Sequence, residues 1–121
     1  MCKKNEMTKQ KTVNILGTEY SIVFDMDGTI LTHDIAARCD TCTKTIYLRP
    51  YEEEHTHRLT YLRHELIHAF FYESGLNTYY QDECLTDWIA IQFPKMARAV
   101  RQTELDVFGT TARAVTTRSE Q

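Results

Sequence analysis

The sequence has few residues that interrupt secondary structure and no segment that could cross a membrane. It holds four glycines, two prolines and a single tryptophan among 121 residues. No apolar run approaches the roughly 20 residues that a membrane-spanning helix needs, and none follows the basic residues near the N-terminus. We therefore expect no signal peptide, no membrane partner and a cytoplasmic location.

Excess positive charge is also lacking. The net charge of −3 and the isoelectric point near 5.9 argue against the basic surface that binds nucleic acid, so we expect no nucleic-acid partner. In a cytoplasmic chain the four cysteines are expected to be reduced thiols. Cys39 and Cys42 form a lone C-x-x-C that could bind a second metal with His55 and His57, although two loop thiols without a role are the simpler interpretation.

The apolar pattern changes its period near the middle of the chain. Short β-branched and aromatic runs predict strands at 12–16, 20–24, 29–32 and 45–49, with an Asp27-Gly28 hairpin turn and a polar loop over 33–43. Beyond them, apolar residues recur every three or four positions. They predict one helix from about Glu52 to a cap at Gly75, a second helix that begins after Asp82, and a third from Lys95 to about Glu104. Residues 77–81 are predicted to form a loop. Pro94 is predicted to break or kink the second helix and can be the first residue of the third.

Strands followed by helices predict an α+β fold. We expect a small antiparallel or mixed sheet of three or four strands, packed on the first long helix, with one or two further helices. Residues 1–10 are expected to be flexible, residues 11–108 to form a single domain, and residues 109–121 to form a disordered tail, because little in either end can be buried.

The first long helix carries the pattern H-E-x-x-H, in which His64 and His68 enclose Glu65. Positions i and i+4 lie one above the other on a helix, so both imidazoles can reach one metal ion. Glu65 lies about 100° around the helix from His64, which places its carboxylate beside such an ion rather than on it. Two nitrogen ligands with a neighbouring base are typical of a zinc hydrolase.

A second pattern lies where a third ligand is needed. Residues 82–87, Asp-Glu-Cys-Leu-Thr-Asp, place Glu83 and Asp87 one helical turn apart. With H-E-x-x-H upstream, this pattern resembles the thermolysin-like glutamate zincins. Residues 62–76 and 87–90 are most similar to the small zincins of phages and prophages, grouped near the ImmA/IrrE-type metallopeptidases. The location would then be the cytoplasm of a bacterial host.

The resemblance implies a zincin-like domain with one Zn²⁺ per chain. Glu83 would be the third ligand beside His64 and His68, Glu65 the general base, and Asp87 the acceptor for the second ring N–H of His64. It implies a zinc-dependent metallopeptidase that acts, as a monomer, on a peptide or protein substrate. The alternative is a zinc-binding regulatory module with the same fold and no turnover.

Two further predictions concern residues near these motifs. Tyr79 and Tyr80 precede Glu83, where a phenol could stabilise an oxyanion, although aromatic packing is the simpler role. The run that includes Asp25 and Asp27 spells the D-x-D-G-T signature of haloacid-dehalogenase-like phosphatases. That family needs a doubly wound sheet and later acidic motifs that the chain does not offer, so a strand with an Asp-Gly turn is the preferred interpretation.

Overall fold

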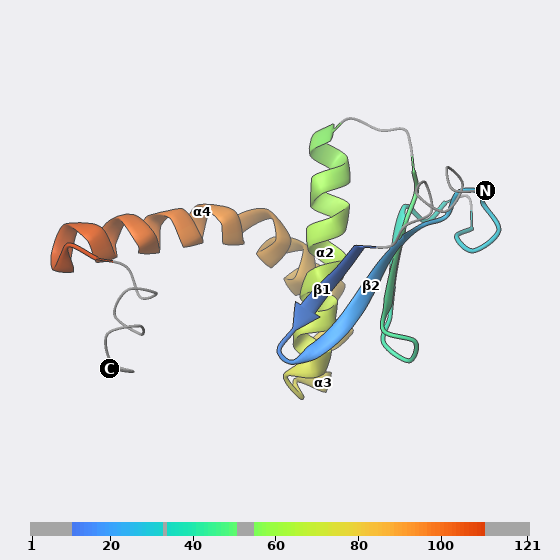
Figure 1. Ribbon diagram of the computed structural model, residues 1–121, viewed down its shortest axis with the longest axis horizontal. Helices are drawn as coiled ribbons and strands as arrows, with labels where there is room; N and C mark the ends of the chain where they lie inside the picture. Colours follow the sequence, from blue (N-terminus) through green and yellow to red (C-terminus); the bar gives the residue numbers. More distant parts are fainter. Residues whose placement is uncertain (1–10, 33, 51–54, 111–121) are drawn as a thin grey trace. The chain divides into compact units, whose positions relative to one another are not determined.

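A computed structural model describes residues 11–32, 34–50 and 55–110 of the chain (Figure 1). The predictions for the N-terminal ten residues, for a helix start near Glu52 and for the tail beyond residue 110 lie outside this part. The chain divides into two compact units, with the boundary between Ile91 and Gln92. The first unit contains a sheet and the helices that carry the predicted site.

The sheet of the first unit has four strands in the order β1-β2-β4-β3. The strands are β1 (Lys11–Ile15), β2 (Thr18–Phe24), β3 (Ala37–Asp40) and β4 (Thr45–Leu48). Neighbouring strands are antiparallel except β2 and β4, which run parallel. This mixed sheet, followed by helices, confirms the predicted α+β class.

The predicted strand at 29–32 is wrong, and β3 lies instead within the predicted loop. The cause is Asp25, whose buried carboxylate accepts hydrogen bonds from the backbone N–H groups of Ile30 (3.1 Å) and Leu31 (2.8 Å). These donors are held in a compact turn, so this segment cannot return along β2 as a hairpin strand. The chain instead reaches the far edge of the sheet and forms β3.

Helix α2 (His55–Glu73) packs on one face of the sheet. Alternate strand residues point to this face, and the core they form with α2 contains Ile15, Tyr20, Ile46 and Ala69. The helix ends as predicted: Gly75 has a φ of 78°, and the N–H of Leu76 donates to the Phe71 carbonyl at 3.0 Å. This cap turns the chain back toward His64 and His68.

The last residue of α2 ties the helix to the sheet through side-chain hydrogen bonds. Glu73 accepts from the hydroxyl groups of Thr18 (3.1 Å) and Tyr20 (2.7 Å) and from the Lys44 ammonium (2.7 Å). The bond from Lys44, followed by that from Tyr20, lowers the pKa of Glu73, while burial and the bond to Glu73 raise the pKa of Tyr20. Glu73 is therefore an ionised clamp at the end of α2.

Two helices follow. Helix α3 (Asn77–Tyr80) is a single turn where a loop was predicted, and α4 (Glu83–Phe108) continues through Pro94, so the predicted break is wrong. Proline removes one backbone donor, but the residues after it are strong helix formers that extend the helix. Asp82 caps α4 as predicted, accepting from the Leu85 N–H at 2.9 Å. No helix among the described residues is long and apolar enough to cross a membrane.

Tyr20→Phe tests the clamp. The substitution keeps the buried ring but removes one charge-assisted hydrogen bond, so we expect the free energy of unfolding to fall by about 1–2 kcal/mol. Because the pKa of Glu73 is lowered in the folded chain, its stabilisation is complete above the usual carboxyl pKa and is lost as the pH falls through the lowered value. Urea denaturation at several pH values should show the difference shrinking in acid.

The matched control is Tyr47→Phe. Tyr47 lies on the opposite face of the sheet, where the Arg38 guanidinium lies 5.3 Å from its ring centroid. A loss of stability equal to that of Tyr20→Phe would contradict the clamp.

Candidate metal centre

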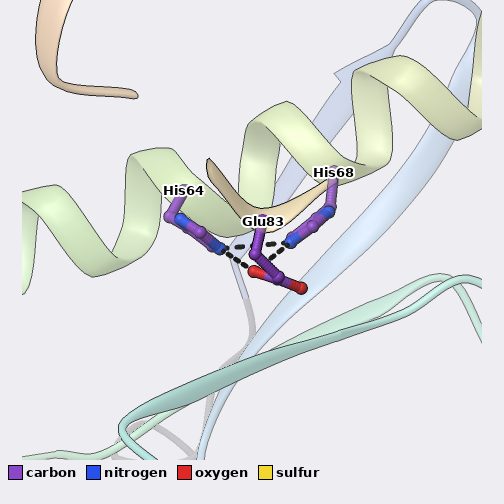
Figure 2. Close-up of side chains that lie close together, drawn as sticks. All are labelled: His64, His68 and Glu83. Carbon is purple, nitrogen blue, oxygen red and sulfur yellow. Dashed lines mark hydrogen bonds and ion pairs between the residues drawn. The ribbon is translucent and has the colours of Figure 1, made fainter. Parts of the chain in front are cut away.

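Three side chains of the predicted site converge on one point. His64 and His68 lie one turn apart on the same face of α2, and Glu83 reaches them from the first turn of α4 (Figure 2). The chain returns to the two histidines over a short distance, through the C-cap of α2, the single turn α3 and the Asp82 cap. Local structure alone therefore brings Glu83 to the two histidines.

The separations between the three ligand atoms fit one metal ion. The Nε2 atom of His64 lies 2.8 Å from Glu83 Oε1 and 3.1 Å from His68 Nε2, and His68 Nε2 lies 3.2 Å from Glu83 Oε1. Ligand atoms bound tetrahedrally at 2.0–2.1 Å stand about 3.3 Å from one another. The group can hold a metal ion with little movement.

The ring of His68 is oriented by a backbone carbonyl. Its Nδ1 atom lies 2.7 Å from the backbone carbonyl of Tyr80, and because a carbonyl only accepts, Nδ1 carries a proton. This leaves Nε2, which faces Glu83 and His64, as the nitrogen that could bind a metal ion.

Asp87 lies on the predicted side of His64. Its Oδ1 atom is 3.5 Å from His64 Nδ1, an ion-pair separation longer than the usual hydrogen bond, and its side chain is about half exposed. Asp82, the alternative third ligand, instead caps α4 and is outside the cluster. The structure therefore brings Asp87 to the ring nitrogen that the sequence pattern suggested, at a looser distance.

Glu65 is buried beside the cluster, and its pKa is raised to about 7. Burial is the largest cause and the charge of Glu83 adds to it, whereas His68 and a hydrogen bond from the Cys39 backbone act in the opposite direction. A carboxyl group that titrates near neutral pH can both accept and return a proton. This is the property that a general base at this position needs.

Beside the cluster lies a cavity of about 320 Å³. Its lining residues are Ile35, Ala37, Arg38, Cys39, Glu65, His68, Tyr80, Gln81 and Glu83. One wall is therefore the edge strand β3, and the opposite wall contains the candidate base and two of the candidate ligands. Any molecule in the cavity would contact both.

The backbone of β3 is directed into this space. The Arg49 N–H donates to the Ala36 carbonyl, so these two residues form a hydrogen-bonded pair. From this pair onward, non-hydrogen-bonded and hydrogen-bonded pairs alternate along the antiparallel ladder of β3 and β4. Cys39, opposite Ile46, falls on a non-hydrogen-bonded pair, so its N–H and C=O point away from β4. The bond from the Cys39 N–H to Glu65 agrees with this direction.

The two candidate oxyanion residues differ in position. The Tyr80 ring lies edge-on to His68 at 5.7 Å and lines the cavity. Tyr79 packs on Phe71 at 6.0 Å and does not line it. Sequence reasoning missed the Tyr80 carbonyl and the Cys39 N–H, because main-chain groups carry no residue-type signal. The loop predicted over residues 77–81 was the available hint.

The remaining candidates do not belong to the group of His64, His68 and Glu83. Among the described residues Cys39 and Cys42 belong to no metal-holding group, and burial raises the pKa of the Cys39 thiol. The side chain of His55 lies outside the described part. Asp25 holds the turn after β2, and Asp27 accepts from the Thr29 hydroxyl at 2.9 Å.

No protein-family model, curated protein or solved structure matches this chain. The chemistry of the centre therefore follows from its own residues: two imidazoles and a carboxylate that can hold a metal ion, with a buried carboxyl group beside them.

Replacing the ligands should remove the metal. We expect His64→Ala and His68→Ala to abolish tight binding of Co²⁺, a visible probe, and Asp87→Ala to weaken it about 10–100-fold through the loss of a ligand's acceptor. His57→Ala, on the same helix and outside the cluster, should bind Co²⁺ as the wild type does. Unchanged affinity in His68→Ala would refute the centre.

Metal binding should also release a proton from Glu65. Without metal its pKa is about 7, so at pH 6.5 the carboxyl is mostly protonated, and a nearby dication favours the ionised form. The number of protons released on metal binding can be measured by calorimetry in buffers of different ionisation enthalpy. The wild type should release roughly half a proton or more beyond the number that the Glu65→Gln variant releases. Equal release by the two proteins would contradict the raised pKa of Glu65.

Proposed function

We propose that the protein is a zinc-dependent metallopeptidase with one Zn²⁺ per chain. The observation that carries the proposal is the convergence of His64, His68 and Glu83 beside a buried carboxyl group that faces a cavity. Two imidazoles and one carboxylate suit zinc, and three protein ligands are typical of catalytic rather than structural zinc sites. The resemblance of the two motifs to the glutamate zincins supports the same ion.

Glu65 is the general base of the proposed reaction. When bound, the zinc ion supplies Lewis-acid chemistry, lowering the pKa of a water molecule and polarising a carbonyl group. Glu65 accepts a proton from the attacking water and returns it to the leaving amine, for which a pKa near neutrality is favourable. The Tyr80 carbonyl holds His68 in the required tautomer, and Asp87 supports His64 more loosely.

An extended peptide is the substrate that the cavity suits. The outward N–H and C=O groups of Ala37 and the outward C=O group of Cys39 can pair with a peptide backbone laid along β3 as an additional strand, whereas the Cys39 N–H is already bonded to Glu65. A peptide in that position would lie beside Glu65. Main-chain pairing gives little preference for side chains, so we expect broad sequence tolerance.

The regulatory-module alternative is less well supported. A module without turnover needs no space beside the metal, whereas here Glu65, His68 and Glu83 line a cavity that is open to a ligand. Burial of Glu65 also carries a free-energy cost that a structural site does not require. Both features support catalysis.

Glu65→Gln separates the two functions. The variant should retain one zinc per chain, because Glu65 is not a ligand, and should lose at least about 100-fold in peptide hydrolysis, the usual contribution of a general base. Hydrolysis of a fluorogenic peptide library, with zinc measured on the same samples, tests this. The control Glu19→Gln, an exposed glutamate on β2, should keep full activity.

Two results would oppose the peptidase. Wild-type protein that holds one zinc and cleaves no peptide would favour the regulatory module. Turnover that survives Glu65→Gln, or that persists after chelation of the metal, would exclude Glu65 or zinc from the reaction.

A further inference from the structure

The described part of the second unit consists mainly of the C-terminal part of α4, and its apolar side chains are exposed. This part of the helix, residues 92–108, is orange in Figure 1. None of its described residues is buried. Phe93, Met96, Val100 and Val107 are between 38% and 63% exposed. We call these four residues the apolar stripe.

We propose that the apolar stripe binds the same stripe of a second copy of this chain, forming an antiparallel homodimer. The spacing of three, four and seven residues places the four side chains within about 60° of arc on the helix. Most of the stability of a helix in a protein comes from packing of its apolar face, so a partner that covers the apolar stripe is expected. This inference goes beyond the proposed peptidase and does not depend on it.

Charge selects a second copy as the partner and sets its direction. The first half of the segment is basic, with Lys95, Arg98 and Arg101, and the second half is acidic, with Glu104 and Asp106. Antiparallel pairing places the basic half of each helix beside the acidic half of the other. A parallel pair would place like charges together along its whole length.

The positions around the helix agree with this direction. With Val100 on the two-fold axis, Phe93 of one chain lies opposite Val107 of the other. Lys95 and Asp106 fall on the same side of the helix, and Lys95 of one chain lies within one residue of the height of Asp106 of the other. Asp106 already accepts a hydrogen bond from Gln102 at 2.9 Å, which directs its carboxylate along that flank.

The size of the contact is sufficient for a weak dimer. Four large apolar side chains and the aliphatic parts of the flanking charges would cover roughly 500–600 Å² on each helix, giving a total near the lower end of specific interfaces. We therefore expect dissociation in the micromolar range. Such an interface should respond strongly to a single charge at its centre.

Sedimentation velocity of the full-length protein from about 5 to 200 μM tests the dimer. In the presence of a chelator, so that no metal can bridge two chains, the wild type should move toward twice its 14.2 kDa mass as concentration rises. Val100→Glu should weaken the dimer at least about 10-fold, with circular dichroism reporting whether the fold is kept. Leu105→Glu, an exposed apolar residue on the other side of the same helix, is the matched control and should still dimerise.

A charge exchange tests the direction. Lys95→Glu should weaken the antiparallel dimer several-fold by facing Asp106, and the double variant Lys95→Glu/Asp106→Lys should restore it. Dimerisation that is insensitive to Lys95→Glu would overturn the antiparallel arrangement. A wild type that stays monomeric at 200 μM, or loses dimerisation equally in Leu105→Glu and Val100→Glu, would overturn the proposal. So would binding of the monomer to phosphatidylcholine vesicles that Val100→Glu abolishes.

Discussion

The candidate metal centre depends on the burial of helix α2 against one face of the sheet. The same helix contributes Ala69 to the core and directs His64 and His68 to the neighbouring face, so the packing that fixes the helix also fixes the two imidazoles. Glu73 adds an ionic clamp at its C-terminal end. A helix anchored by core contacts and by a clamp has little freedom to rotate, which is what a preorganised binding site requires.

The pKa values of two neighbouring glutamates are shifted in opposite directions within this small region. Burial raises the pKa of Glu65, which keeps that carboxyl group partly neutral, whereas the contacts with His64 and His68 outweigh burial at Glu83 and lower its pKa. Two glutamates close together thus differ in protonation because one has imidazole partners and the other is mainly desolvated. Such a division between neighbouring carboxyl groups is typical of sites where one binds and the other transfers a proton.

The sequence predicted the structural features that depend on the local spacing of side chains. It did not predict the features that depend on tertiary contacts. Helix α2, its Gly75 cap and the Asp82 cap follow from side-chain types at helical intervals, whereas the meeting of Glu83 with the histidines was implied by the resemblance to the glutamate zincins. Strand β3 followed from neither, because it depends on a turn held by buried Asp25 and on a parallel pairing between β2 and β4 that no short pattern encodes. The contribution of Tyr80 is a carbonyl oxygen, which every residue has. Zinc and peptide hydrolysis stay predictions.

The unequal exposure of the three ligands has a kinetic consequence. The Glu83 side chain is 71% exposed and lies in the first turn of its helix, whereas His68 is 9% exposed and held by a carbonyl. An arriving ion would meet the glutamate first and pass inward to the imidazoles, and a departing ion would keep its histidine bonds longest. Exchange of the ion would therefore proceed through the exposed Glu83 carboxylate, and a bound peptide that covers this carboxylate would slow it.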